Sequence, residues 1–146
     1  MEENRKIVIV DASVILKWML PEREDVRKAI LLQEDFYSKR LSFLVPAHFH
    51  AELANTIGLK LPMIAFQFIH RILDSEFRPC QLSLEVARLA FKFMQKYKRI
   101  SFYDAFYHAL AIDRRGTFVT ADERYYRTVK SEGHIVLLRD YSYEKV

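Results

Sequence analysis

Short apolar runs rich in β-branched residues alternate along the chain with longer segments in which apolar residues recur at helical spacing. Residues 7–10 read Ile-Val-Ile-Val, which is typical of a strand buried on both faces. Between residues 26 and 37 the apolar positions return every three or four residues, which indicates a helix. The same criteria predict strands at 7–10, 43–45, 77–82, 117–120 and 135–138. They predict helices at 14–20, 22–39, 46–60, 63–73, 84–97, 101–113 and 122–129.

Prolines mark several of these boundaries. We expect Pro21 to close the first helix and Pro46 to open the third, because proline is tolerated in a first helical turn. Pro79 weakens the third strand, since it has no N–H to donate. The helix at 63–73 is apolar on nearly every side, so we expect part of it to contact a partner.

Strands that alternate with helices predict an α/β fold, a three-layer α/β/α sandwich around a mainly parallel five-stranded sheet. No linker, repeat or charge block interrupts the 146 residues, so we expect a single domain over 1–146. In such sheets, functional residues collect at the carboxyl ends of the strands. Asp11 closes the first strand and Asp122 lies just beyond the fourth, which makes both of them candidates.

Composition and charge narrow the class of protein. Lys and Arg number 23 against 19 Asp and Glu, a net charge of +4 that is compatible with nucleic acid without demanding it. The lone cysteine, Cys80, excludes an internal disulfide and suits a reducing cytoplasm. No apolar run reaches the roughly 18 residues of a membrane span, and residues 1–13 are too charged for a signal peptide. We therefore expect a cytoplasmic protein without a membrane segment.

Four acidic residues are candidates for chemistry, although each has a structural explanation when taken alone. Asp11 and Asp122 stand where an acid caps the following helix. Asp104 follows Ser101 with the spacing of a capping box. Glu52 lies inside a predicted helix, where a solvated glutamate is the common explanation. Taken one at a time, these structural explanations stay open.

Other candidates are weaker. His48 and His50 are two residues apart on a predicted helix, so they cannot share a metal ion as an i, i+4 pair could. His108 lies one turn after Asp104, where ordinary packing explains it. Ser13 has no His–acid arrangement beside it and no nucleophile elbow. The three glycines are isolated, which excludes the glycine-rich loops that bind nucleotides.

Four stretches of the chain form an ordered set. They are residues 7–18 (IVIVDASVILKW), Val45-Pro46 with 51–55 (AELAN), 101–105 (SFYDA) with its helix through Ala111, and 118–122 (FVTAD). Each stretch alone is common. In this order and with these spacings, over almost the whole chain, they resemble the PIN-domain nucleases and most closely their VapC-type toxin branch. The resemblance reverses the capping interpretation of each acid.

The resemblance implies a metal-dependent endoribonuclease that hydrolyses RNA phosphodiester bonds, the toxin of a toxin–antitoxin pair. Carried over, the catalytic and metal-binding residues are Asp11, Glu52, Asp104 and Asp122, with Ser13, Thr120 and Asn55 in support. Four carboxylates in one cleft repel one another, so they take up protons or bind a cation. Oxygen ligands without a thiolate favour Mg²⁺ or Mn²⁺ over zinc.

The resemblance also implies partners. Toxins of this branch bind an RNA substrate and a small antitoxin protein, and form homodimers. We expect the helix at 63–73 or the apolar face of 26–37 to make one of the protein contacts. Lys17, Arg124 and Arg127 flank the motifs and are candidates for holding a phosphate backbone.

Two alternatives belong to other classes. A PIN domain that binds RNA or protein without cutting it would have the same fold, although it has no need of all four acids. A receiver-type phosphorylation domain begins with a similar strand and acid. It also needs a phosphoacceptor aspartate after a third strand near mid-chain and a later lysine after a strand, and neither is present.

Overall fold

One five-stranded sheet organises the molecule. The computed structural model describes residues 4–20 and 25–146. The strand order is β3-β2-β1-β4-β5, and every neighbouring pair is parallel. The predicted α/β sandwich is therefore confirmed, with a sheet that is parallel throughout. The strands are β1 (Lys6–Val10), β2 (Leu41–Pro46), β3 (Phe77–Cys80), β4 (Thr117–Thr120) and β5 (Ile135–Leu137).

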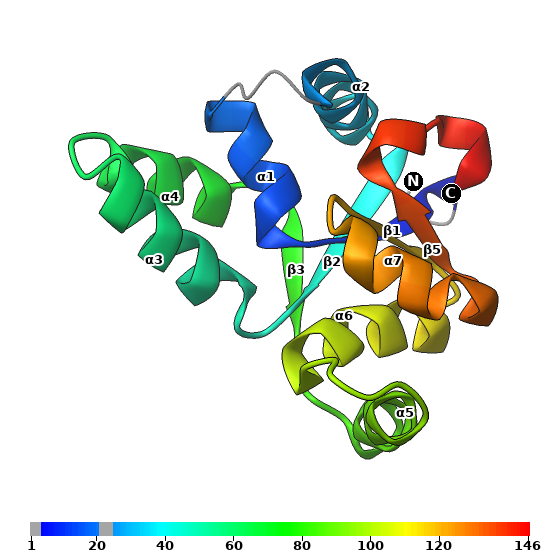
Figure 1. The fold of residues 1–146 in the computed structure, drawn as a ribbon. Helices are drawn as coiled ribbons and strands as arrows, with labels where there is room; N and C mark the ends of the chain where they lie inside the picture. Colours follow the sequence, from blue (N-terminus) through cyan, green and yellow to red (C-terminus); the bar gives the residue numbers. More distant parts are fainter. Residues whose placement is uncertain (1–3, 21–24) are drawn as a thin grey trace.

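Helices cover both faces of this sheet (Figure 1). The helices α1 to α4 lie on one face and α5 to α7 on the other. Right-handed crossovers require this arrangement, because the chain moves first toward β3 and then back toward β5. Over the described ranges, no helix combines the length and apolar character needed to cross a membrane. The helices are α1 (Ala12–Met19), α2 (Val26–Tyr37), α3 (Phe49–Lys60), α4 (Ala65–Asp74), α5 (Leu84–Lys96), α6 (Phe102–Asp113) and α7 (Glu123–Val129), followed by short 3₁₀ turns η2 (Lys130–Glu132), η3 (Leu138–Asp140) and η4 (Tyr143–Lys145).

The central strands and an aromatic cluster hold the elements that carry the acids. Residues 8–10 of β1 are fully buried, between α6 on one face and the α1 layer on the other. The rings of Phe36 and Phe43 stack with centroids 4.3 Å apart, which packs α2 onto β2. The indole N–H of Trp18 donates to the carbonyl of Ala29 at 3.0 Å. Large aromatic side chains contribute most to such a core, so the last turn of α1 is held against α2.

Pro46 ends β2 instead of opening a helix, so that prediction is wrong. It pairs in register with Cys80 of β3. The N–H of Ala47 then donates to the Cys80 carbonyl at 3.0 Å, which extends the pairing one residue past the proline. Helix α3 begins only at Phe49.

Two other helices also begin at least two residues later than predicted. Asp25 has a φ of 64°, a left-handed conformation that cannot continue a helix, so α2 starts at Val26. Residues 22–24, where that helix was predicted to begin, lie outside the described residues, as does Pro21, which was predicted to close the first helix. A turn over 62–64 delays α4 until Ala65. The remaining boundaries differ from the predictions by one or two residues.

The two edge strands are short. Pro79 lies in β3, opposite Val45 of β2, at an edge where a missing backbone donor is tolerated. At the other edge, β5 has three residues before the chain turns into η3. Neither edge offers a long row of free backbone groups.

Candidate active site

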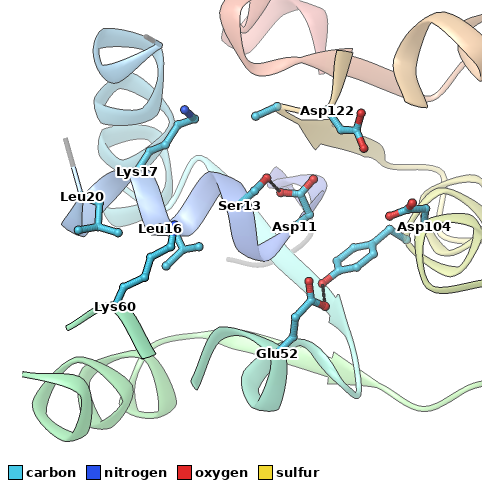
Figure 2. Close-up of a pocket in the computed structure, with 11 residues that line it drawn as sticks. Asp11, Ser13, Leu16, Lys17, Leu20, Glu52, Lys60, Asp104 and Asp122 are labelled. Carbon is cyan, nitrogen blue, oxygen red and sulfur yellow. Dashed lines mark hydrogen bonds between the residues drawn. The ribbon is translucent and has the colours of Figure 1, made fainter. Parts of the chain in front are cut away.

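The four acids named from the sequence line one pocket at the carboxyl ends of the strands (Figure 2). The chain leaves β1 and β4 on opposite faces of the sheet, and such a switch point opens a crevice. Asp11 follows β1 directly, and Asp122 comes two residues after β4. Glu52 and Asp104 are supplied by the first turns of α3 and α6. The pocket measures about 370 Å³.

Asp11 both caps a helix and faces the pocket. Its Oδ1 accepts the backbone N–H of Val14 at 3.1 Å, as an N-cap does, and also the hydroxyl of Ser13. Its Oδ2 accepts the hydroxyl of Thr120 at 2.6 Å, which ties the end of β1 to the end of β4. The side chain is fixed by three donors, so capping and a place in the site are compatible.

Asp122 repeats this double role, whereas Asp104 does not. Asp122 caps α7 by accepting the N–H of Tyr125 at 3.0 Å. In α6 the cap is Ser101, whose hydroxyl accepts the N–H of Asp104 at 3.1 Å. The Asp104 carboxylate is thus placed in the first helical turn without being consumed as the cap, and it turns toward the pocket (Figure 2).

Glu52 lies at the rim of the pocket and touches two aromatic neighbours. Its side chain is 48% exposed. The phenol of Tyr107 donates to Glu52 Oε2 at 3.5 Å. His48 Nε2 lies 3.4 Å from the same oxygen without forming a hydrogen bond. Burial lowers the pKa of His48, so at neutral pH it is an uncharged neighbour.

Burial and mutual repulsion raise the pKa values of three of these carboxyls. Burial is the largest cause at Asp11, and the charge of Asp104 adds to it. At Glu52 burial is again first, followed by the charge of Asp11, with a smaller contribution from Asp104. At Asp104 burial leads and the charge of Asp122 adds. Asp104 is therefore the acid that interacts electrostatically with each of the other three.

A model of the PIN domain family matches residues 8–131. The chain belongs to the PIN domain family. The family predicted from the four motif stretches is confirmed, since the match spans all of them except residue 7. No curated protein sequence matches this PIN domain significantly.

Solved structures of low identity share the fold of this PIN domain. A toxin–antitoxin complex from Klebsiella pneumoniae has a TM-score of 0.67 at 14% identity, over 90% of this chain and 97% of that chain. VapC20 from Mycobacterium tuberculosis, a toxin that cleaves the sarcin–ricin loop, has a TM-score of 0.61 at 17% identity, over 87% and 95%. FitAcB from Neisseria gonorrhoeae has a TM-score of 0.65 at 17% identity, over 95% and 99%. At these identities the likeness establishes the fold alone.

The donor set of this PIN domain fits a hard divalent cation. All four candidate ligands are carboxylates, and three have pKa values raised in part by one another's charge, which a cation would relieve. Within residues 4–20 and 25–146, no three acidic, histidine or cysteine side chains converge into a ready-made metal cage. The acids surround an open pocket, as mutual repulsion favours.

The supporting residues divide into those near the acids and one outside the pocket. Ser13 lines the pocket, and the Thr120 hydroxyl fixes Asp11 by donating to its Oδ2. Asn55 is exposed and does not line the pocket. His108 is buried and bonds to Tyr125 Oη at 3.1 Å and to a backbone carbonyl, which agrees with the packing role expected for it.

Sequence reasoning missed two residues of the pocket wall, Lys60 and Tyr107. Lys60, at the end of α3, lines the pocket opposite the aspartates together with Lys17, which was a candidate (Figure 2). Tyr107 stands one turn after Asp104, and burial, followed by the charge of Glu52, raises the pKa of its phenol, so it remains a neutral donor. The helical spacing from Asp104 could have indicated Tyr107. Nothing local indicated Lys60, because α3 reaches the pocket only in the folded chain.

Proposed function

We propose that this PIN domain is a metal-dependent endoribonuclease that hydrolyses RNA phosphodiester bonds, and that it acts as the toxin of a toxin–antitoxin pair. The observation that carries the proposal is the pocket lined by Asp11, Glu52, Asp104 and Asp122 at the switch point of a parallel sheet. Membership of the PIN family and likeness in fold to toxin structures support it. Action in the cytoplasm agrees with the single free thiol of Cys80.

The four carboxylates would hold Mg²⁺ or Mn²⁺. When bound, such an ion orients a phosphate and lowers the pKa of a water molecule so that it can attack. The chain's own contribution is positional. Ser13 and Thr120 fix both oxygens of Asp11 before substrate arrives. Lys17 and Lys60 place positive charge on the pocket wall, which attracts a polyanionic backbone toward the acids.

Cleavage of a mixed structured RNA tests the proposal. Wild-type protein should cut RNA with Mn²⁺ or Mg²⁺ and should not cut with EDTA. Asp104→Asn should lose most of the activity while keeping the fold. The matched control is Asp113→Asn, the same substitution at the exposed far end of α6, where the acid pairs with Arg114 at 3.6 Å. The control should cut like wild type.

Two results would contradict the proposal. Equal cutting by wild type and by Asp104→Asn would place the activity elsewhere or in a contaminant. Specific binding of RNA or of a partner without metal-dependent cutting, after testing the RNAs of the source cell, would favour a non-cleaving PIN scaffold.

We also propose that the apolar surface of α4 contacts a second protomer or a small antitoxin. Phe66 in α4 is 83% exposed, and Met63 just before it is 92% exposed. Exposed aromatic and aliphatic side chains grouped in this way are typical of protein interfaces. Phe66→Asp should shift the molar mass measured by light scattering toward the monomer or abolish antitoxin binding. The control Leu84→Asp, on the exposed start of α5, should change neither.

A further inference from the structure

A second pocket adjoins the acid pocket and has the opposite charge on its outer wall. It measures about 390 Å³ and shares Asp104 and Asp122 with the first pocket. Its outer wall carries Lys98, Arg99 and Arg124, and we call it the basic pocket. Asp104 and Asp122 therefore belong to both walls, and the second pocket adds three cations beside them.

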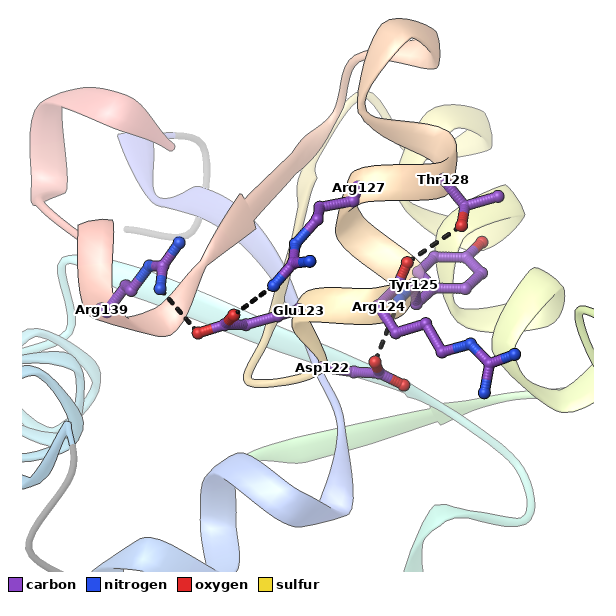
Figure 3. A network of polar contacts seen from close by, with 7 residues as sticks. All are labelled: Asp122, Glu123, Arg124, Tyr125, Arg127, Thr128 and Arg139. Atoms are coloured by element: carbon purple, nitrogen blue, oxygen red, sulfur yellow. Dashed lines mark hydrogen bonds and ion pairs between the residues drawn. The ribbon is translucent and has the colours of Figure 1, made fainter.

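On α7, one arginine is neutralised and another is not (Figure 3). Arg127 donates to Glu123 at 2.9 Å, and Arg139 donates to the same carboxylate at 2.6 Å. Figure 3 shows these two side chains directed at Glu123, whereas Arg124 points away from it. In the part of the chain that the structure describes, Arg124 forms no ion pair. Its guanidinium is thus available to an incoming anion on the side that faces the basic pocket.

The other two cations lie on an anchored turn between α5 and α6. Lys96 pairs with Glu132 at 2.7 Å, and the phenol of Tyr97 donates to the same carboxylate at 2.5 Å. Because these contacts engage Glu132, it does not neutralise the next two residues. Lys98 and Arg99 are exposed, and over residues 4–20 and 25–146 neither forms an ion pair. The fold therefore holds three unneutralised cations around one pocket.

We propose that the basic pocket binds a backbone phosphate of the RNA substrate, next to the phosphate that lies over the acids. The inference rests on the proposed function and adds to it a specific path for the strand. A phosphodiester chain entering a site of four carboxylates needs positive charge on both sides of the reacting group. Arginine provides paired donors that match phosphate oxygens, and lysine adds a point charge. Contacts to the backbone fix register and direction without reading the sequence, so the basic pocket sets which way the strand lies across the acids.

RNA binding measured without cleavage tests this path. The probe is a short, unstructured, fluorescently labelled RNA in EDTA, and the readout is its anisotropy at several salt concentrations. Arg124→Gln and the double variant Lys98→Gln/Arg99→Gln should each bind about 5- to 10-fold more weakly near 0.1 M salt. The slope of log K against log salt should fall by about 0.7 for each lost phosphate contact with a single strand. The control Arg127→Gln, one turn along the same helix, should stay within about twofold of wild type.

Cleavage kinetics with Mn²⁺ supply a second readout. Arg124→Gln should raise KM and leave kcat nearly unchanged, because the side chain contacts a phosphate that does not react. If wild type cuts RNA while Arg124→Gln and the double variant bind and cut like Arg127→Gln, the basic pocket is not a substrate site and the proposed function stands. A fall in kcat without weaker binding would also overturn the inference. If folded wild type neither binds nor cuts RNA, the proposed function fails and the inference fails with it.

Discussion

Replacing Asp104 by asparagine should make this PIN domain more stable while it abolishes activity. The charge of Asp104 acts on Asp11 and Glu52, and the charge of Asp122 acts on Asp104. Burial, followed by the charge of Asp122, raises the pKa of Asp104 above its ordinary value. A carboxyl whose pKa is raised by folding destabilises the fold once it ionises, because the unfolded chain releases the proton more easily. Asparagine keeps the size of the side chain, and the cap of α6 is unaffected because the Ser101 hydroxyl supplies it.

The size of the gain follows from the geometry. Two unit charges 4 Å apart interact by about 1 kcal/mol in water and about 4 kcal/mol at an effective dielectric of 20. Asp104 is half-buried and faces the other three acids across an open pocket. Solvent screening therefore reduces each repulsion to roughly a few tenths of a kcal/mol. The summed gain is about 1 kcal/mol, which corresponds to a rise in Tm of about 3 °C for a domain of this length.

Thermal unfolding in EDTA at low salt and pH 7 measures this gain. It should shrink in 1 M salt, where charges are screened over about 3 Å. It should also shrink as the pH falls through the raised pKa of Asp104 toward the ordinary value of 3.8, and it should vanish below that value, where the carboxyl is protonated in both states. With Mn²⁺ the order should reverse, because wild type gains binding free energy that the variant has lost. An Asp104→Asn protein that melts below wild type in EDTA, with Asp113→Asn unchanged, would refute the reasoning.

Three further changes test the scaffold around the site. Gly116→Ala should lower stability by about 1–3 kcal/mol in chemical denaturation, because the new methyl group would come within 2.6 Å of a β1 backbone oxygen. Tyr141→Phe should lower it by about 1.5–3 kcal/mol, since the Tyr141 phenol donates at 2.5 Å to the buried carboxylate of Asp35; no loss would mean that this bond contributes nothing. Metal-dependent cleavage should rise with pH to a midpoint above the ordinary carboxyl range, because a ligand must lose its proton to bind the ion. Thr120→Val should move that midpoint higher still, since it removes a donor that lowers the pKa of Asp11, and an unmoved profile would count against Asp11 as a ligand.

Two of the four acids could be predicted from the strand pattern, because they lie at the ends of strands. The apolar run of β1 stops at Asp11, and Asp122 follows β4, so the topology of a parallel sheet brings both to one edge. Glu52 and Asp104 follow from no such rule. Helix packing brings them to the pocket, and only the ordered resemblance to a family indicated them.

The cations could not be predicted in the same way. Arg124 and Arg127 were candidates alike, because both are basic residues beside the last motif. The spacing of Glu123 to Arg127 is i, i+4, which would have indicated the pair that neutralises Arg127. Nothing along the chain shows that the turn at Lys98 lies beside α7, since that depends on how α5 and α6 pack. The prediction that Pro46 opens a helix failed for a different reason. Proline suits the last position of a strand as well as the first turn of a helix, and Pro46 ends β2.

The edges of the sheet limit how this PIN domain can assemble. An exposed strand is a template for β-augmentation, in which another chain adds its backbone to the ladder. Here β3 carries Pro79, which lacks a donor, and β5 ends after three residues. Continuous growth of the sheet from one molecule into the next is therefore disfavoured, which protects the protein from edge-to-edge aggregation. Any specific partner must instead recognise side chains on the helical layers, where a mutation can separate binding from folding.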